Sequence, residues 1–301
     1  MAQRFYRIGA LVAGDQFLPA FGGFKKKMAE LGYHEGKNIS YDLQNSEGDS
    51  ETLKNLAEKL VKNKPDLIVT SSTTATVPVA KLTEGTSLPV VFLTAGNPLA
   101  FVKSYASSGN NLTGISNSSI ELTGKRLELL KEIAPTFRRL ISLYDTQHVS
   151  YEPTKRAVQE EAKKLKLTVV ELMISSKEEL NSKLGSLSRK VGDAIFIPPQ
   201  ASIVAAMKEI IQHSIRERLP TIAPTFDDVR SGALATYGAD YGRLGQQGAM
   251  LVDKIIRGAR PSDLPIEPPY KLYLVINAKT AKLVGLKIPK AVLLRTDELI
   301  E

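Results

Sequence analysis

Short apolar segments alternate with amphipathic helical segments along almost the whole chain, and this alternation is the feature that most limits its possible folds. Short segments that are mostly apolar are typical of strands buried on both faces of a sheet. Seven such runs occur, at residues 8–13, 67–70, 90–93, 140–144, 169–173, 194–197 and 221–223. Two more segments, 39–43 and 272–276, alternate apolar and polar residues, which predicts half-buried strands.

Helices are predicted between these strands, from apolar residues at helical spacing. Gly32 suits the end of the first helix, Asp49 or Ser50 suits the start of the second, and Ser176 with Glu179 forms a capping-box pattern. The helical segments are 21–31, 53–61, 127–134, 180–187, 203–211 and 244–255. Buried strands that alternate with helices predict an α/β protein, with parallel sheets covered by helices on both faces.

The length of 301 residues allows one large sheet, a barrel or two doubly wound domains. A barrel would need eight evenly spaced strand–helix units. The polar stretch 107–119 and the proline-rich stretch 261–269 instead suit crossings between two lobes. We therefore expect two doubly wound lobes.

Composition removes several functional classes. The chain has no cysteine, which excludes disulfides, thiolate metal sites and a cysteine nucleophile. No apolar run approaches the ~20 residues that span a bilayer. The net charge of +8 raises the possibility of nucleic acid or an anionic membrane as a partner. However, most lysines alternate with glutamates on predicted outer helix faces, and no aromatic RNA-binding motif accompanies them, so we expect no nucleic-acid partner.

The N-terminus shows no leader. Met1-Ala2-Gln3-Arg4 leads directly into the first apolar strand, without a basic and then apolar signal segment. The chain is therefore expected to be either cytosolic or the mature form of a secreted protein with an added initiator Met.

The common catalytic and cofactor motifs are absent. The sequence has no GxGxxG, no GxxxxGK[ST] and no HExxH, and Gly114-Ile115-Ser116-Asn117-Ser118 fails the GxSxG pattern at its last position. The histidines His34, His148 and His213 are far apart in the sequence, although His148 follows a strand end and could face a cleft. We expect no catalytic residues, no metal site and no cofactor.

Small polar residues recur where the predicted strands end. Ligands of open α/β sheets bind outside these carboxyl ends, and hydroxyls with free amides at a helix N-terminus suit an anion. At any single strand end these residues could simply be helix caps and turns, but their recurrence favours a ligand site. The candidates are Asp15, Gln16, Ser71, Ser72, Thr73, Thr74, Gly96, Asn97, Asn117, Tyr144, Asp145, Pro198, Gln200, Phe226, Asp227, Tyr237 and Asp240.

Several longer motifs resemble one family, the ABC transporter substrate-binding proteins related to tryptophan- and tyrosine-binding proteins. Gly32-Tyr33-x-Glu35-Gly36-x-Asn38-Ile39 looks like the family's L-G-Y-x-E-G-x-N segment. The C-terminal part is more specific, with Gly258-Ala259-x-Pro261-x-Asp263-Leu264-Pro265 followed by Leu274-Val275-Ile276-Asn277-x-Lys279-Thr280-Ala281. The similarity runs nearly end to end. One departure is Gly96-Asn97-Pro98, where the family commonly has Gly-Asp-Pro.

The resemblance implies the type I periplasmic-binding fold, with two lobes joined by three crossings near Ser116, Tyr237 and Pro268. The N-terminal lobe would comprise residues 1–116 and 238–267, and the C-terminal lobe residues 117–237 and 268–301. It also implies a signal sequence that this chain has lost, a periplasmic or membrane-associated extracytoplasmic location, and an ABC transporter permease as partner of a monomeric protein.

The function expected from the resemblance is binding of a small ligand for delivery to an importer, with an amino acid, aromatic or not, expected ahead of another small carboxylate. Ser72, Thr73 and Thr74 would hold its carboxylate. Asp145, Asp227 or Asp240 would take its ammonium, and Tyr144, Phe226 or Tyr237 would stack on its side chain. Tyr237 could equally pack a hinge, and Asp227 could equally cap a turn. Ligand contacts with both lobes would favour a closed form.

Two other classes of function remain open. A cytosolic sensor on the same fold would need a DNA-binding module, and none precedes the first strand. An enzyme on a two-lobed scaffold would need converging titratable groups, which the motifs do not reveal.

Overall fold

The computed structural model describes residues 4–301 and divides the chain into two compact units. Unit 1 comprises residues 1–118 and 241–270, and unit 2 comprises residues 119–240 and 271–301. The divisions fall two or three residues after the crossings expected from the sequence. The expected start at Met1-Ala2-Gln3 lies outside the described residues. Among residues 4–301, no helix combines the length and the apolar character needed to cross a membrane.

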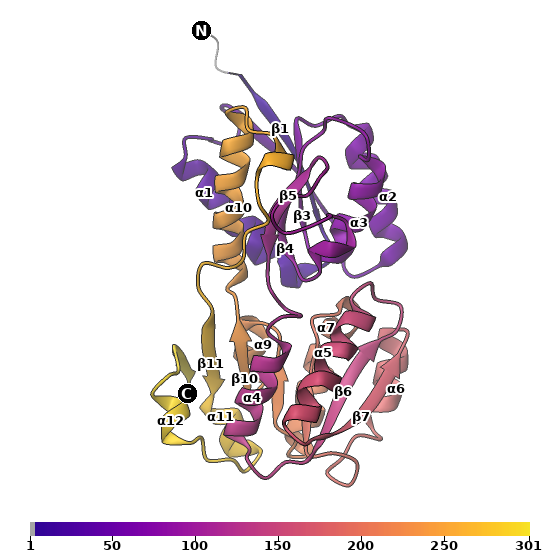
Figure 1. The fold of residues 1–301 in the computed structure, drawn as a ribbon, viewed down its shortest axis with the longest axis vertical. Helices are drawn as coiled ribbons and strands as arrows, with labels where there is room; N and C mark the ends of the chain where they lie inside the picture. The colour runs from indigo at the N-terminus through magenta and orange to yellow at the C-terminus, as the bar shows by residue number, and fades with distance from the viewer. Residues whose placement is uncertain (1–3) are drawn as a thin grey trace. The chain divides into compact units, whose positions relative to one another are not determined.

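Unit 1 is built on a five-stranded parallel sheet with the order β2-β1-β3-β4-β5 (Figure 1). Its strands are β1 (Tyr6–Val12), β2 (Ile39–Asn45), β3 (Leu67–Ser71), β4 (Val90–Ala95) and β5 (Leu112–Ser116). Its helices are η1 (Asp15–Phe17), α1 (Leu18–Glu30), α2 (Ser50–Lys62), α3 (Thr73–Leu82), η2 (Pro98–Ala100), α10 (Tyr241–Ile256) and η3 (Pro261–Asp263). Strands β3 and β4 are buried along their whole length, as their apolar runs predicted.

Helices α1 and α10 lie side by side, although more than 200 residues separate them in sequence (Figure 1). Their backbones touch through glycines. A Cβ atom at Gly23 would lie 1.9 Å from the carbonyl oxygen of Gly242, and one at Gly245 would lie 1.8 Å from that of Ala20. Only glycine fits at such an approach, so these two positions fix how the returning α10 packs onto unit 1.

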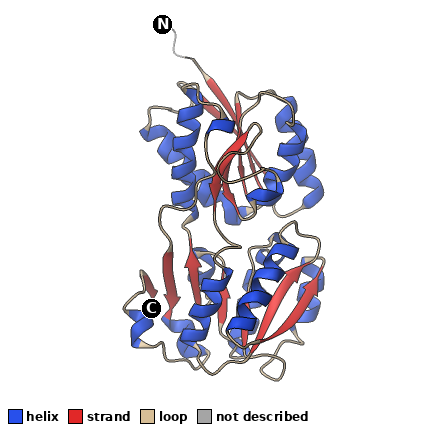
Figure 2. Ribbon diagram, in the orientation of Figure 1, coloured by secondary structure: helices blue, strands red, loops and turns tan. Residues whose placement is uncertain are grey.

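Unit 2 is built on a seven-stranded sheet with the order β12-β11-β10-β9-β8-β6-β7. Its strands are β6 (Arg139–Asp145), β7 (Thr168–Ile174), β8 (Ala194–Phe196), β9 (Thr221–Ala223), β10 (Ala235–Gly238), β11 (Tyr273–Asn277) and β12 (Glu298–Ile300). Its helices are α4 (Thr123–Ile133), α5 (Tyr151–Lys164), α6 (Lys177–Leu184), α7 (Ala201–Val204), α8 (Met207–Arg216), α9 (Phe226–Arg230), α11 (Ala278–Leu283) and α12 (Lys290–Leu293). Figure 2 shows how the helices cover these strands.

The sheet of unit 2 is mixed, which corrects the expectation of wholly parallel sheets. Strand β11 pairs antiparallel with β10, with Ala235 opposite Ile276, while β12 pairs parallel with β11. The reason is topological: the chain enters β11 from unit 1, without the crossover helix that a parallel neighbour of β10 would need.

Strand β6 supplies both cores of unit 2, because its side chains alternate between the two faces of the sheet. Ile141 and Leu143 pack into one core, whereas Leu140 and Tyr144 pack into the other. The sequence missed β5, because its five residues lie inside the stretch 107–119 that was interpreted as a crossing. It also merged α7 and α8, which are separate helices.

Candidate functional site

The carboxyl edge of the unit 1 sheet holds the predicted hydroxyl run, at the point where β3 leads into α3. Ser72 is the N-cap of α3, and its Oγ accepts a hydrogen bond from the backbone N–H of Ala75 at 3.0 Å. The Ser72 hydroxyl proton is still available for donation, because an oxygen that accepts one hydrogen bond can also donate one. The first turn of the ten-residue α3 adds backbone N–H groups and the positive end of the helix dipole.

Ser72 also carries backbone strain. Its φ of 94° and ψ of 157° lie in a region that is essentially reserved for glycine. Two hydrogen bonds hold it there: its N–H donates to Thr94 Oγ1 at 3.1 Å, and its carbonyl accepts from Thr76 Oγ1 at 2.7 Å. Strain of this kind costs about 1–3 kcal/mol and persists where the surroundings enforce it, often at ligand sites.

Thr73 ties α3 to the loop after β4. Its Oγ1 accepts hydrogen bonds from the N–H groups of Gly96 at 3.0 Å and Asn97 at 2.9 Å. The amides of Gly96 and Asn97 are therefore directed at Thr73, so the two backbone donors expected at this strand end are already engaged. The Oγ of Ser71, at the end of β3, is buried and has no hydrogen-bond partner. This arrangement leaves the hydroxyl of Ser71 as an unused polar group of the edge.

The remaining unit 1 candidates flank this edge. Asp15 accepts a hydrogen bond from the side-chain amide of Asn45 at 2.7 Å, and Gln16 lies next to it in η1. The side-chain amide of Asn117 donates to the carbonyl of Thr94 and to the hydroxyl of Tyr241. The sequence did not single out Tyr241, whose ring stacks on Phe17 with centroids 5.8 Å apart. No motif marks it, because Tyr241 meets this edge only through the return of α10.

The carboxyl edge of unit 2 brings Asp145 and Gln200 together. The backbone N–H of Asp145 donates to Gln200 Oε1 at 2.7 Å, and its carboxylate accepts from the N–H of Gln147 and the hydroxyl of Ser202. Gln200 is fully buried, and its Nε2 has no hydrogen-bond partner. Pro198 is buried beside it in the same loop after β8. Burial lowers the pKa of nearby His148 to about 4, against an upward effect of Asp145.

Two predicted stacking residues have core positions instead. Tyr144 is fully buried in the core that also contains Leu140, and its ring packs edge-on against Tyr151. Burial raises the pKa of Tyr144 to about 12. Phe226 is buried in the other core, edge-on to Tyr273. A stacking role does not fit either residue, because both rings already pack against side chains of unit 2. Tyr237 is half-buried on β10 and remains a candidate.

The acids differ in their surroundings. Asp227 is exposed and pairs with Arg230 at 3.4 Å. It is not the cap of α9: the capping box is made by Thr225 and Asp228. Asp228 is buried, and burial raises its pKa to about 6, while hydrogen bonds from the hydroxyl and N–H of Thr225 act in the opposite direction. Asp240 is half-buried at the end of the segment that leaves unit 2.

Sequence reasoning also missed Arg126, a fully buried residue of α4. Its guanidinium donates to the carbonyls of Tyr237 at 2.9 Å, Pro224 at 3.1 Å and Ser119 at 3.3 Å. These carbonyls belong to three separate segments at the carboxyl edge of unit 2, so Arg126 organises that edge. The segment 124–131 contributed to the family resemblance, but its pattern does not show that this cation is buried.

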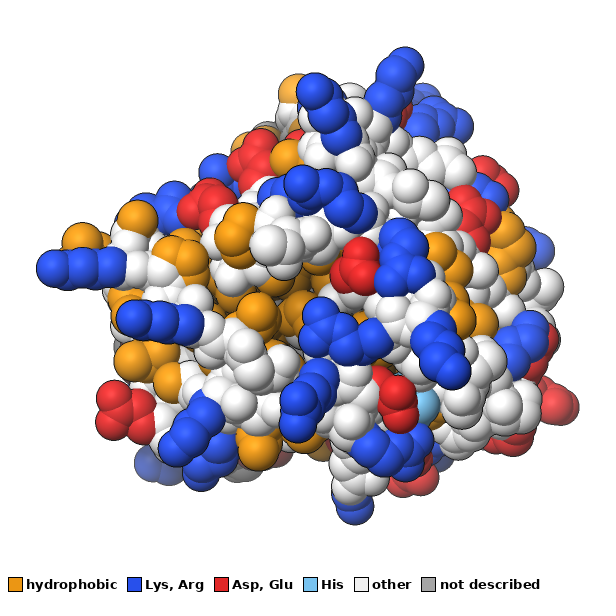
Figure 3. Space-filling model, turned by 90° about the horizontal axis from the view of Figure 1, so that it is seen from below, with side chains coloured by type: hydrophobic (Ala, Val, Ile, Leu, Met, Phe, Trp, Pro, Cys, Tyr) orange, Lys and Arg blue, Asp and Glu red, His pale blue; other side chains and the backbone are white. Residues whose placement is uncertain are grey.

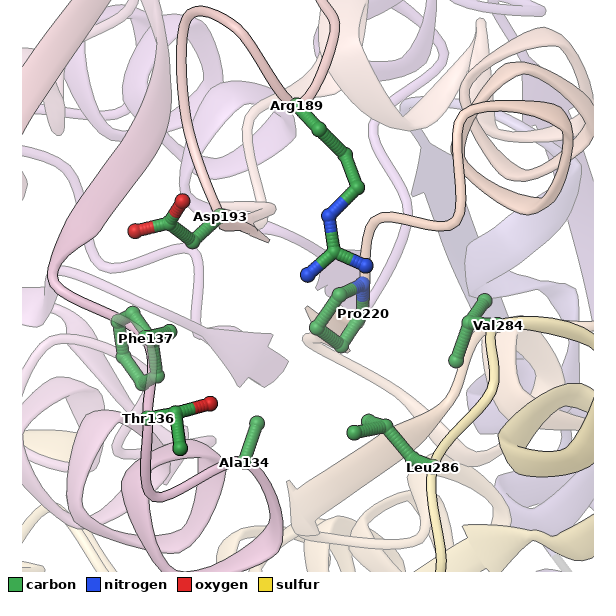
Figure 4. A pocket seen from close by; sticks show the side chains of 8 residues that line it. All are labelled: Ala134, Thr136, Phe137, Arg189, Asp193, Pro220, Val284 and Leu286. Carbon is green, nitrogen blue, oxygen red and sulfur yellow. The ribbon is translucent and has the colours of Figure 1, made fainter.

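Metal-binding side chains do not cluster in the described part of the chain. Within residues 4–301, no group of three or more His, Asp or Glu side chains could hold a metal ion. A hollow of about 120 Å³ in unit 2 lies at the opposite, amino edge of the sheet (Figure 4). Phe137 and Asp193 precede β6 and β8, and Pro220 precedes β9, so this hollow is separate from the predicted ligand-binding edge.

The chain is similar to one family of known proteins over almost its whole length. The model of the family described as ABC transporter substrate binding protein matches residues 7–300. A tyrosine-binding protein of Clostridioides difficile (strain R20291) is 31% identical over 288 residues, which cover 95% of this chain and 82% of that protein.

Two solved structures share the fold. A conserved domain protein from Vibrio cholerae has a TM-score of 0.92 at 24% identity, and covers 98% of this chain and 100% of its own. An ABC domain in complex with L-Trp from Streptococcus pneumonia has a TM-score of 0.90 at 26% identity, with the same coverage. The predicted resemblance and the type I periplasmic-binding fold are therefore confirmed.

Proposed function

Because this chain belongs to the ABC transporter substrate-binding protein family, we propose that it binds an aromatic amino acid outside the cytoplasm and delivers it to an ABC importer. The choice of ligand is supported by two relatives, one named for binding tyrosine and one solved with L-Trp. The family's role supports the proposed extracytoplasmic location, and we propose that the protein acts as a monomer with the importer's permease as its partner. The proposal assigns no chemical step to the protein itself.

The observation that carries the proposal is the strained Ser72 at the start of α3. An amino-acid carboxylate placed there would accept from the Ser72 hydroxyl and from N–H groups of the first helical turn. A charge-assisted hydrogen bond of this kind contributes about 1.5–3 kcal/mol. Thr94 and Thr76 hold the strained backbone through the hydrogen bonds described above, so the donors would be in place before the ligand arrives.

The acids of unit 2 are proposed partners for the ligand's ammonium. Asp145, Asp227 and Asp240 remain the alternatives, and the structure distinguishes them by what they already bind. The carboxylate of Asp145 is oriented by Gln147 and Ser202, whereas that of Asp227 is exposed and engaged by Arg230. Fixed orientation favours Asp145, because a preorganised acceptor loses less freedom when it binds. Tyr237 is the remaining aromatic candidate for contact with the ligand ring.

Calorimetric titration with tyrosine, tryptophan and phenylalanine tests the ligand class, with tyramine as the matched compound that lacks the carboxylate. We expect saturable binding of at least one amino acid, and binding of tyramine at least about a hundredfold weaker, since it loses the charge-assisted bonds. Equal affinity for tyrosine and tyramine would contradict the assignment at Ser72. Conversion of the bound amino acid to another compound during the titration would favour an enzyme.

Variants locate the carboxylate. Ser72→Ala and Thr74→Ala are expected to weaken binding by about ten- to a hundredfold. Ser176→Ala is the matched control, because Ser176 caps α6 in the same way as Ser72 caps α3, through a hydrogen bond from the N–H of Glu179. The control should lose about 1 kcal/mol of stability and keep its affinity. If Ser72→Ala behaves like Ser176→Ala, then Ser72 is a cap and not a ligand contact.

A further inference from the structure

The amino edge of the unit 2 sheet collects positive charge from four neighbouring parallel strands. Arg138, Lys166, Lys190 and Arg218 stand in the loops before β6, β7, β8 and β9, and all four are exposed. Within the described part of the chain, none of the four forms an ion pair. Because the amino ends of parallel strands meet at one edge, these four side chains share one face of unit 2.

Three acids near this edge already have partners, whereas Glu301, which follows β12 at the same edge, is exposed. Asp193 pairs with Arg139 at 2.8 Å, Glu217 pairs with Arg216, and Glu132 pairs with Arg295. Their charges therefore do not neutralise the four exposed cations. Figure 3 shows the molecule from below, where Lys and Arg side chains surround a central area of hydrophobic side chains and acidic side chains lie between them.

The C-terminal segment adds lysines and exposed leucines to the same edge. Val284 and Leu286 line the hollow together with Phe137 and Pro220 (Figure 4), which places residues 284–286 beside the loops before β6 and β9. Lys282, Lys287 and Lys290 are exposed and form no ion pair within residues 4–301.

Exposed leucines lie beside these lysines in the sequence and shortly after them. Leu294 is 79% exposed and Leu283 is 52% exposed. Leu293 is also exposed, and Val292 is the buried residue of the short helix α12. Leucines exposed beside lysines are typical of protein surfaces that enter the headgroup region of a bilayer.

From these observations we propose that this basic and leucine-bearing face, the amino edge of unit 2, docks onto the surface of a bilayer that contains anionic lipids. Charge complementarity requires an anionic occupant. Within residues 4–301, the large apolar side chains that this edge exposes are Leu283, Leu293, Leu294 and Val191, and none of them is an aromatic ring that could stack on nucleic-acid bases. A bilayer also needs no shape match with lysines spread over several loops, whereas an acidic peptide would need a fitted groove.

Vesicle co-sedimentation of the full chain tests the proposal, with phosphatidylcholine vesicles that contain or lack phosphatidylglycerol. We expect binding to the anionic vesicles, weakened by salt, and at least about tenfold weaker binding to phosphatidylcholine alone. Each cation near an anionic surface contributes about 1 kcal/mol, or about fivefold in affinity. The triple variant Lys282→Gln, Lys287→Gln, Lys290→Gln should therefore bind about a hundredfold more weakly.

A matched triple variant in unit 1 distinguishes an effect of charge on the proposed face from an effect of the protein's net charge. Lys54→Gln, Lys59→Gln and Lys62→Gln remove the same charge from exposed positions on α2 and should change vesicle binding by less than about threefold. Equal losses in the two triple variants, or no binding of the wild type to anionic vesicles, would overturn the proposal. Unchanged melting temperature and amino-acid affinity show that each variant is folded.

The leucines distinguish a bilayer from an acidic polymer. Leu294→Ser should weaken binding to anionic vesicles several-fold and leave binding to polyglutamate unchanged. The protein could instead bind polyglutamate more tightly than anionic vesicles, with no effect of Leu294→Ser on either. That result would show that the face binds an acidic peptide, and it would overturn the proposed docking onto a bilayer. Because no residue of this face belongs to the proposed amino-acid site, the outcome is independent of the function proposed above.

Discussion

The two sheets expose different chemistry at their carboxyl edges, although both belong to doubly wound lobes. The edge of unit 1 is held by short hydroxyl side chains and uncharged hydrogen bonds, centred on Ser72, Thr73 and Thr94. The edge of unit 2 is held by buried ionisable groups, Arg126 and Asp228. The stability of unit 1 at this edge should therefore be insensitive to pH, whereas that of unit 2 should depend on charge.

The contrast also concerns sequence distance. The hydrogen bonds that hold α3 either lie within one short run, such as Ser72 to Ala75 and Thr76, or reach the end of β4 and the loop after it, 22 to 24 residues away. Arg126 instead donates to the carbonyl of Pro224, which is 98 residues away. Loss of one hydrogen bond around α3 leaves the other bonds in place. Loss of the Arg126 side chain removes the donor to three distant segments at once.

Removal of the Arg126 side chain is expected to have the largest effect. Arg126→Met should lower the free energy of unfolding of unit 2 by about 3–5 kcal/mol, because three backbone carbonyls lose their buried donor. The free energy of unfolding of Arg126→Lys should lie between those of the wild type and Arg126→Met, since one ammonium cannot replace a planar guanidinium at three acceptors. Hydrogen exchange of the amides of unit 2, with unit 1 as internal reference, measures the loss.

Lys125→Ala is the control for this position, because Lys125 is the exposed neighbour on the same helix and pairs with Glu128. It should change stability by less than about 0.5 kcal/mol. If Arg126→Met is as mild as Lys125→Ala, the buried cation does not organise the edge, and the contrast between the two units is lost.

The pH dependence of unit 2 is the second test, because two buried groups act in opposite directions. Burial raises the pKa of Asp228 to about 6, so its contribution to stability is fully present below the unfolded pKa near 4 and is lost as the pH rises through 6. The pKa of His148 is lowered to about 4, so its contribution is present above 6.5 and is lost as the pH falls towards 4.

Between pH 6.5 and pH 4 these contributions oppose each other, and single variants should separate them. On acidification, Asp228→Asn should lose more stability than the wild type, by up to about 3 kcal/mol, because the gain from Asp228 is gone. His148→Gln should lose less than the wild type, by about 1–2 kcal/mol, since His148 is partly exposed. Urea unfolding at a series of pH values provides the data. Parallel curves for the wild type and both variants would show that neither group titrates with a shifted pKa.

The sequence predicted the parts of the fold that depend on local pattern. Strand β9 was predicted at its observed bounds, Thr221–Ala223, and the N-cap of α2 is Asp49, one of the two candidates. The capping pattern at Ser176 was predicted, but the carboxylate of Glu179 reaches the N–H of Ser175 and not that of Ser176. Strand β11 was also found, whereas its antiparallel pairing was not, since a strand's direction depends on where the chain enters the sheet.

The candidate sites show the same limit. The run Ser71–Thr74 could be located because the residues that form it adjoin a buried strand in sequence. Arg126 and Tyr241 could not, because their roles depend on segments that meet only after folding. Tyr144 and Phe226 were misassigned for a related reason: a strand-end aromatic can point into the core, and the alternation of β6 places Tyr144 there.

The smallest expected effect concerns the two capping serines, and it compares one strained position with one relaxed position. Ser72 has φ 94°, whereas Ser176 has φ −154° in ordinary extended backbone. Replacing an N-cap serine with glycine costs only a few tenths of a kcal/mol, and glycine at a positive φ relieves strain of about 1 kcal/mol or more. Ser72→Gly should therefore stabilise unit 1 slightly, while Ser176→Gly should destabilise unit 2 slightly. Thermal melting of both variants shows whether each is more or less stable than the wild type. Calorimetry adds a separate criterion, because Ser72→Gly should bind the amino acid more weakly despite its higher stability. A Ser72→Gly protein that is less stable than wild type would mean that the cap contributes more than the strain costs, and the argument from strain to ligand site would then fail.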